Sequence, residues 1–369
     1  MISFGDPSAS YQAHKSEIDQ AIKRVLNSGW YVLGTEVEAF EKEFASFHGK
    51  DFNAVGVANG TDAISLCLRS LGLGSGDEVI TPSHTAVATV AGIEQAGCTP
   101  VFADIDPHTR CIAPNSVKER VGSSTRAIMP VHIYGQPAEM HRILEIAKVH
   151  NLALVEDCSQ AHGAEIDGQK VGTFADISAF SCYPTKNLGG TGDGGVILCR
   201  SKGFAEKIKS LRQYGWNEER ESISPGFNSR LDELQATILR VKLQHLADDN
   251  TKRREIALRY NAAFKDLPIT LPALPETELH AMHLYVVEYD QRNELMEYLR
   301  SRQIGASLHY PLAVHQHTAY ANRIRGGDNL PVTDQFYQRN LTLPMYPELS
   351  NGAVEHIIST VQDWFRENK

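Results

Sequence analysis

The sequence predicts an α/β protein with a mostly parallel central sheet flanked by helices, followed by a smaller α+β region. Between about residues 50 and 200, short apolar runs alternate with helix-period segments, as in parallel strands joined by helical crossovers. Beyond Asn228 the apolar residues instead recur every three or four positions, as in a long helix. With 42% hydrophobic residues among 369, the chain can bury one large core or two smaller ones. We expect a large domain over 1–250 and a small C-terminal α+β domain over 251–369.

The expected elements follow in chain order. Apolar runs predict buried parallel strands, joined by right-handed crossovers, at 54–58, 78–81, 100–104, 127–132, 153–157, 177–181 and 196–199. An apolar stripe at helical spacing predicts a helix that begins near Thr61. A long helix should follow Asn228. The small domain shows further strand and helix signals at 283–287, 292–302 and 352–365.

The composition argues against several kinds of partner. The net charge is −9, and no run rich in Lys or Arg is present, so we expect neither nucleic acid nor an anionic membrane as a partner. The N-terminus lacks the basic and apolar regions of a secretion signal, and no stretch has the length of a membrane span. The six cysteines lack CxxC pairs and are interpreted as reduced thiols. We therefore expect a cytoplasmic protein.

A single lysine precedes a glycine-rich turn after the expected strand at 177–181. The segment reads Tyr183-Pro-Thr-Lys-Asn-Leu-Gly-Gly-Thr-Gly-Asp-Gly-Gly195. A Walker loop would place the lysine after the glycines, and a dinucleotide fingerprint would lead into a helix rather than a strand, so neither pattern fits. The glycines let the backbone turn sharply beside a bulky ligand, with Lys186 as a reactive amine. A surface turn with a solvated lysine is the alternative.

Two further segments carry polar residues at the ends of elements. Asp157 and Gln160 follow the strand at 153–157, where ligands gather in α/β sheets, so the acid can keep a heterocyclic nitrogen protonated and the amide can bind a ring hydroxyl. Gly60 and Thr61 lie at a helix N-terminus, where free N–H groups favour a phosphate. Ordinary helix caps are the alternative for Asp157 and Thr61.

Together the three segments match pyridoxal 5′-phosphate (PLP). Its phosphate needs an anion site, its pyridine nitrogen needs a carboxylate, and its aldehyde needs an amine. Lys186 first anchors the cofactor and, once released by an incoming amine, moves a proton between the substrate carbon and the cofactor. We expect no metal ion at this site.

These motifs, in this order, resemble the DegT/DnrJ-type PLP-dependent nucleotide-sugar aminotransferases, which have the aspartate aminotransferase fold (fold type I). The resemblance covers nearly the whole chain, through 28–34, 60–63, 155–163, 183–189, 228–235 and 343–347. It implies that Lys186 is the covalent anchor and that Asp157 pairs with the pyridine nitrogen. The other implied cofactor contacts are Gln160 beside the ring and Gly60, Thr61 and Ser181 at the phosphate.

The resemblance also implies a homodimer in which Asn228 of each subunit completes the cofactor pocket of the other. The local sequence fits, because the capping-box-like Ser229 to Asp232 would start the long helix and place Asn228 at its mouth. A simple chain turn at Asn228 is the alternative. One departure concerns the ring. Members usually carry a stacked aromatic residue where this chain has Ala86, so either His84 takes over the stacking or the face stays open for substrate.

The resemblance further implies an activity. The deoxygenating branch of the family typically replaces the lysine by histidine, so Lys186 favours transamination, with L-glutamate as the donor. The segment 308–317 resembles a pattern of members that act on 3-keto sugars, although Ala313 and His317 depart from it. A dTDP-linked 3-keto-6-deoxyhexose is therefore the favoured acceptor. The alternatives are a 4-keto sugar on a dTDP, UDP or GDP carrier, and a non-catalytic PLP-fold binding or regulatory protein.

Several residues are candidates for contact with the substrate. The arginines can bind a diphosphate or a carboxylate through paired hydrogen bonds, although surface ion pairs explain Arg220 at least as well. The histidines at 309, 315 and 317 invite a metal-binding interpretation, but Asp, Glu and Cys are absent nearby at ligand spacing. The candidates are Tyr31, Tyr183, Arg220, Arg230, His309, Tyr310 and His315.

Overall fold

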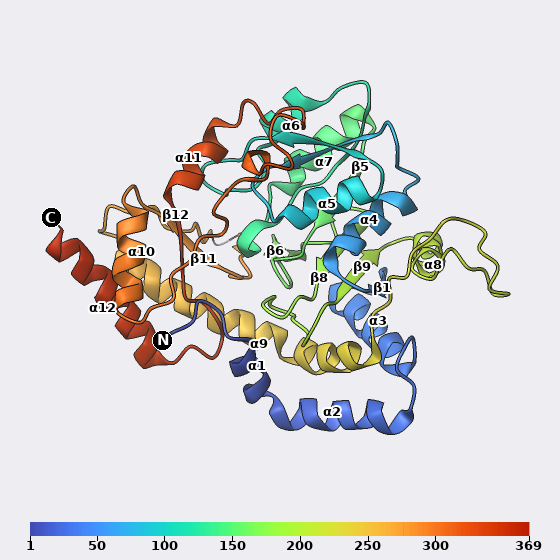
Figure 1. Cartoon of the computed structure of the whole chain (residues 1–369), viewed down its shortest axis with the longest axis horizontal. Coiled ribbons are helices and arrows are strands. Elements are labelled where there is room, and N and C mark those ends of the chain that lie inside the picture. Colours follow the sequence, from blue (N-terminus) through green and yellow to red (C-terminus); the bar gives the residue numbers. More distant parts are fainter. Residues whose placement is uncertain (276, 369) are drawn as a thin grey trace.

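A computed structural model describes residues 1–275 and 277–368 of the chain. Within these residues the central sheet has seven strands, in the order β1-β9-β8-β5-β4-β2-β3 (Figure 1). They are β1 (Asn53–Val57), β2 (Glu78–Pro82), β3 (Thr99–Ala103), β4 (Thr125–Ile128), β5 (Ala153–Asp157), β8 (Ile177–Ser181) and β9 (Gly195–Cys199). Strand β9 runs antiparallel to β1 and β8, whereas the pairs from β8 to β3 are parallel. The predicted α/β fold is confirmed, and each predicted apolar run overlaps one of these strands.

Helices cover both faces of the sheet because alternate strand residues point to opposite sides. Val55 and Ala54, neighbours on β1, lie in different apolar cores. The core around Val55 includes side chains of α4 and α8, and the core around Ala54 includes side chains of α3 and α9. These helices are α3 (Thr35–His48), α4 (Gly60–Ser70), α8 (Lys202–Leu211) and α9 (Glu233–Phe264).

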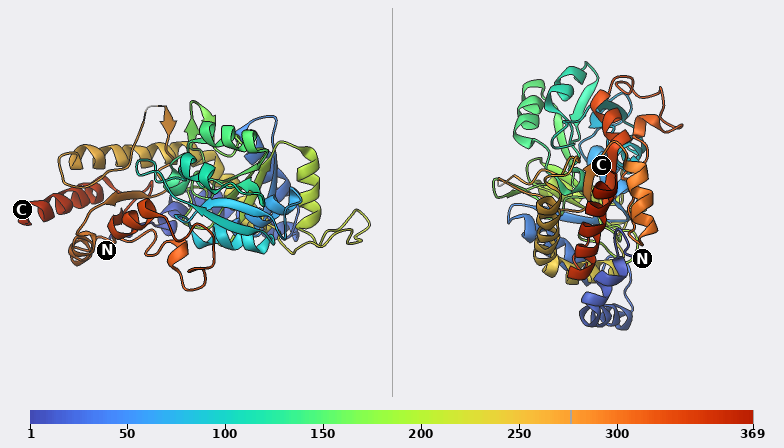
Figure 2. Two further views of the ribbon diagram at one scale, coloured as in Figure 1. Left: turned by 90° about the horizontal axis from the view of Figure 1, so that it is seen from above. Right: turned by 90° about the vertical axis from the view of Figure 1, so that its left-hand side faces the viewer.

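The remaining helices extend these layers (Figures 1 and 2). Helix α2 packs on α9 through Ile18 and Ala21, against Ile238 and Val241. A further core joins α6 and α7 to β2, β3 and β4. Apart from two helices of the C-terminal part, the other helices are α1 (Pro7–Ala13), α2 (Lys15–Ser28), α5 (Val87–Gln95), α6 (Pro114–Arg120), α7 (Met140–His150), α11 (Pro331–Arg339) and the short η1 (Ile133–Gly135) and η2 (Val314–Gln316).

The C-terminal part packs on the second half of α9. Strand β11 (Tyr285–Glu288) pairs antiparallel with β12 (Asn340–Leu343), and α10 (Arg292–Ser301) and α12 (Asn351–Glu367) share one apolar core with them. A small separate sheet joins β10 (Glu278–Leu279), β6 (Glu165–Ile166) and β7 (Gln169–Lys170). Helix α9 is continuous across residue 250, so the expected division at that residue falls inside a helix and stays a prediction.

None of the helices described combines the length and the apolar character that a bilayer crossing requires.

Candidate active site

Lys186 lies in the turn after β8, where its backbone N–H donates to the Tyr183 carbonyl at 2.8 Å. The turn needs glycine at 189, because a Cβ there would stand 2.5 Å from the Pro184 carbonyl oxygen. The Lys186 side chain is half-buried and lines two cavities, of about 240 and 330 Å³. Burial lowers the pKa of its amine to about 8, although the charge of Asp157 opposes this shift. The amine is therefore partly neutral near neutral pH, as a nucleophile or base must be.

The smaller cavity, called the inner cavity, is lined among others by Gly60, Thr61, Asp157, Gln160, Ser181 and Lys186. At one end lies the N-terminus of α4, where the Asn59 side chain accepts a hydrogen bond from the Asp62 N–H at 2.8 Å. A Cβ on Gly60 would stand 2.6 Å from the Ser181 Cβ, so glycine allows this close approach of helix and strand. The free N–H groups of the helix and the Thr61 and Ser181 hydroxyls suit a phosphate.

Asp157 lies at the carboxyl end of β5 and is only 2% exposed. Its Oδ2 accepts from the Thr89 hydroxyl at 2.8 Å, and its Oδ1 accepts from the Ser159 N–H at 3.0 Å. A turn rather than a helix follows, so the helix-cap explanation of Asp157 does not hold. A buried carboxylate needs donors or a cation, and a protonated ring nitrogen in the inner cavity would supply both.

Gln160 is held at both ends of its amide. Its Oε1 accepts from the Tyr134 N–H at 2.8 Å, and its Nε2 donates to the Tyr310 hydroxyl at 3.0 Å. These two bonds fix which end of the amide carries the oxygen. Through Gln160, the turn after β5 is tied to the segment that contains Tyr310, on the border between the two cavities.

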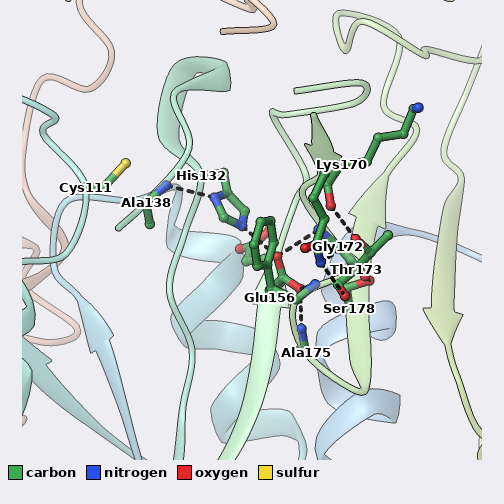
Figure 3. Close-up of polar contacts among 12 residues, drawn as sticks. Cys111, His132, Ala138, Glu156, Lys170, Gly172, Thr173, Ala175 and Ser178 are labelled. Carbon is green, nitrogen blue, oxygen red and sulfur yellow. Dashed lines mark hydrogen bonds and ion pairs between the residues drawn. The ribbon is translucent and has the colours of Figure 1, made fainter. Parts of the chain in front are cut away.

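Glu156 is the neighbour of Asp157 on β5, so its side chain points to the opposite face of the sheet. Figure 3 shows the polar contacts around it. Its fully buried carboxylate accepts from the N–H groups of Gly172, Phe174 and Ala175 at 2.7–2.9 Å. It also lies 3.2 Å from Nε2 of His132. These bonds attach β5 to the loop that leads into β8, and so fix the strand of Asp157 relative to the strand that precedes Lys186.

The larger cavity, called the outer cavity, is lined among others by Lys186, Arg253, His283, His309, Tyr310 and Glu348. The structure thus brings the predicted His309, Tyr310 and Tyr183 to the same space as Lys186. Burial and the charge of Lys186 lower the pKa of His309 to about 4, so its ring is neutral. The cavity therefore offers aromatic walls and a neutral imidazole close to Lys186.

Two predicted histidines do not reach these cavities. The His84 ring is fully buried 4.6 Å from the Phe336 ring, and its Nδ1 lies 3.0 Å from the Tyr337 hydroxyl. Ala86 lines the inner cavity instead, with no aromatic side chain at that position. His315 lies between the Ser83 hydroxyl at 2.8 Å and the Asp334 carboxylate at 3.0 Å.

Four further candidates lie outside both cavities of the single chain. Tyr31 is 50% exposed, and Arg220 is exposed with its guanidinium over the Trp216 ring. Arg230 is half-buried and Asn228 is exposed.

The predicted start of the long helix is wrong. Helix α9 begins at Glu233, with Asp232 at the N-cap position, so Asn228 does not lie at the helix mouth. Instead, Asn228 forms a β-bridge with Gln213. The physical reason is that the Ser229 hydroxyl accepts a hydrogen bond from the distant Ala58 N–H at 3.1 Å rather than capping the helix.

Several residues that the sequence did not reveal support the site. Thr89 donates to Asp157, Asn187 binds His283, and Arg253 donates to the Met345 carbonyl at 3.1 Å. Only Asn187 carried a local signal, since it follows the lysine directly. The others come from distant segments, and nothing in their own sequence context predicts the contact.

An anion site on a helix N-terminus, a buried carboxylate at a strand end and an amine of lowered pKa face one inner cavity. On this fold, those features define a PLP-dependent enzyme. The chain matches the DegT/DnrJ/EryC1/StrS aminotransferase family over residues 12–362. The protein therefore belongs to this family, whose aminotransferases use PLP.

Individual relatives agree over their full length. The chain is 43% identical to dTDP-3-amino-3,6-dideoxy-α-D-galactopyranose transaminase of Aneurinibacillus thermoaerophilus, over 98% of this chain and 99% of that protein. It is 41% identical to dTDP-3-amino-3,4,6-trideoxy-α-D-glucose transaminase of Streptomyces venezuelae, over 98% and 96%. The structure matches the crystal structure of S. venezuelae DesV with a TM-score of 0.95, at 40% identity over 98% of both chains.

Proposed function

We propose that the protein transfers an amino group from L-glutamate to the keto carbon of a dTDP-linked 3-keto-6-deoxyhexose. The observation that carries this proposal is the position of Lys186, a residue that lines both a cavity suited to PLP and a second, polar cavity. The similarity to two dTDP-3-amino-sugar transaminases supports the nucleotide and the position on the sugar.

The residues of the inner cavity divide the work of holding PLP. The α4 N-terminus and the Ser181 hydroxyl would hold the phosphate, and Asp157 would hold a proton on the pyridine nitrogen. When bound, PLP supplies the electron sink that makes a substrate carbon acidic. Lys186, whose amine is partly neutral, would accept the proton from that substrate carbon and donate it to the cofactor carbon.

We also propose a homodimer that shares its active sites through Asn228. The segment between α8 and α9 projects from the body of the molecule in Figures 1 and 2. Its Ile223 is 67% exposed, and Trp30, in another segment, is 64% exposed, so both offer apolar surface that a second subunit would cover. The cytoplasm is the compartment we propose, because all six cysteines of the described chain are buried and unpaired.

The test compares Lys186→Ala with Lys23→Ala, which changes an exposed lysine of α2. Wild-type protein and Lys23→Ala should bind PLP covalently and should retain it after borohydride reduction. Both should also aminate the 3-keto sugar nucleotide. Lys186→Ala should lose the covalent link and the turnover. Turnover by Lys186→Ala would refute the proposed role, and a product aminated at C-4, read by NMR, would refute the proposed position.

A further inference from the structure

His283 is a buried imidazole that the proposed chemistry does not use. It lies two residues before β11 and is 6% exposed. Its backbone N–H donates to the Tyr134 carbonyl at 2.9 Å, which holds the residue in place. The side chain lines the outer cavity together with Lys186.

The proton on the His283 ring can be placed from its neighbours. The Asn187 amide nitrogen donates to the Asn250 Oδ1 at 2.8 Å and to the Ala281 carbonyl at 2.7 Å. Both amide hydrogens are thereby used, so the Asn187 oxygen can only accept. Because that oxygen lies 3.1 Å from Nδ1 of His283, Nδ1 must carry the proton. The Nε2 atom is then an unprotonated acceptor.

The surroundings keep the ring neutral. Burial, together with the charges of Lys186 and Arg253 and the nearby rings of His309 and His162, lowers the pKa of His283 well below its ordinary value. The acids of the outer cavity, Asp6, Asp249 and Glu348, have no hydrogen bond to this ring within the described residues. Within the described residues Nε2 has no hydrogen-bond partner either, and it is not a fully buried atom, so it is accessible from the outer cavity. The outer cavity therefore contains a fixed acceptor that awaits a donor from a bound molecule.

We infer that His283 is a specificity-determining residue, whose Nε2 accepts a hydrogen bond from a ring hydroxyl of the hexose bound in the outer cavity. This inference rests on the proposed function and adds a contact to it. The side chains of Tyr183, Tyr310 and Tyr346 line the same cavity, and aromatic faces combined with polar atoms suit a hydroxylated ring. A sugar that lacks the hydroxyl would leave a buried acceptor unpaired, which disfavours its binding.

The first test needs no ligand. Histidine labelled with ¹⁵N in the apo protein should give, for His283, a protonated Nδ1 and an unprotonated Nε2 that do not change between pH 5.5 and 8.5. Asn187→Ala should disturb this state, because the acceptor of the Nδ1 proton is removed. A proton on Nε2 in the wild type, or titration of the ring within this range, would overturn the inference.

The second test separates the two edges of the ring. In His283→Asn the short amide can still donate to Asn187 but leaves the Nε2 position empty, whereas in His283→Gln the longer amide can place an oxygen near that position. Reverse transamination with 2-oxoglutarate is measured on the PLP-loaded proteins. The probes are dTDP-3-amino-3,6-dideoxy-D-galactose and its 2-deoxy and 4-deoxy analogues.

The wild type should lose about tenfold or more in kcat/KM, mainly through KM, on one of the two analogues. His283→Asn should lose this preference and His283→Gln should retain part of it. Equal preferences in wild type and His283→Asn, or none in the wild type, would overturn the inference. If the wild type forms its covalent PLP link but accepts none of the three sugars, the proposed substrate fails and the hydroxyl contact fails with it. Should His283→Asn not fold, the NMR result and His283→Gln decide.

Discussion

Replacing Glu156 by glutamine should lower the free energy of unfolding by about 3–6 kcal/mol. The buried carboxylate accepts hydrogen bonds from three N–H groups of the loop 172–175, and it faces Nε2 of His132. The His132 Nδ1 accepts from the Ala138 N–H at 3.0 Å, so Nε2 must also be a donor. A glutamine keeps one accepting oxygen, but its NH₂ group then points at two donors. Two bonds to a charged acceptor are lost, at about 1.5–3 kcal/mol each.

Urea unfolding of the apo protein, followed by tryptophan fluorescence and circular dichroism, measures this change. Glu145→Gln is the matched control, because Glu145 is exposed on α7 and makes no hydrogen bond within the described residues; it should stay within about 0.5 kcal/mol of the wild type. A loss under about 1 kcal/mol for Glu156→Gln relative to this control would show that the loop does not depend on the carboxylate.

Three further changes test the inner cavity. In the apo protein the rate of acylation of Lys186 should rise with pH, with a midpoint near pH 8, and a midpoint near 10.5 would contradict this. The free energy of unfolding should increase between pH 8 and 10.5, because in this range the lysine is protonated in the unfolded chain but neutral in the folded one. Gly60→Ala should weaken PLP binding at least about tenfold in a fluorescence titration, since the new Cβ would collide with Ser181, and unchanged affinity counts against the phosphate site. Thr89→Val removes a donor to Asp157 and should slow the glutamate half-reaction in stopped-flow absorbance, while an unchanged rate would show that the bond is dispensable.

The sheet could be predicted from the sequence because buried parallel strands appear as short continuous apolar runs. The run at 177–181 coincides with β8, and the run at 153–157 coincides with β5. Their carboxyl ends meet at one edge of the sheet, which is why Asp157 and Lys186 could be expected to converge. The place of Gly60 and Thr61 in the site could be predicted by the same rule, because the helix that they begin follows the carboxyl end of β1.

Other features could not be predicted, because they depend on partners far away in the chain. His315 binds Ser83 across 232 residues, and the hydroxyl of Ser229 binds the N–H of Ala58 across 171. His84 lies in a βα loop near the expected position of the cofactor ring. Its side chain instead packs against Phe336 and Tyr337, outside the inner cavity. Local pattern identifies which residues are polar, and tertiary packing decides where they point.

Helix α9 has 32 residues and thus a length of about 48 Å. Its first residue, Glu233, accepts a hydrogen bond from the N–H of Gly34 at 2.8 Å. Further along the helix, Asn250 accepts a hydrogen bond from Asn187, the neighbour of Lys186, and Arg253 donates one to the Met345 carbonyl. Helix α9 therefore contacts the N-terminal segment, the residue next to Lys186 and the C-terminal part of the chain. A bend of α9 at residue 250 would therefore displace Asn187, the neighbour of Lys186, and change the position of the lysine relative to the inner cavity.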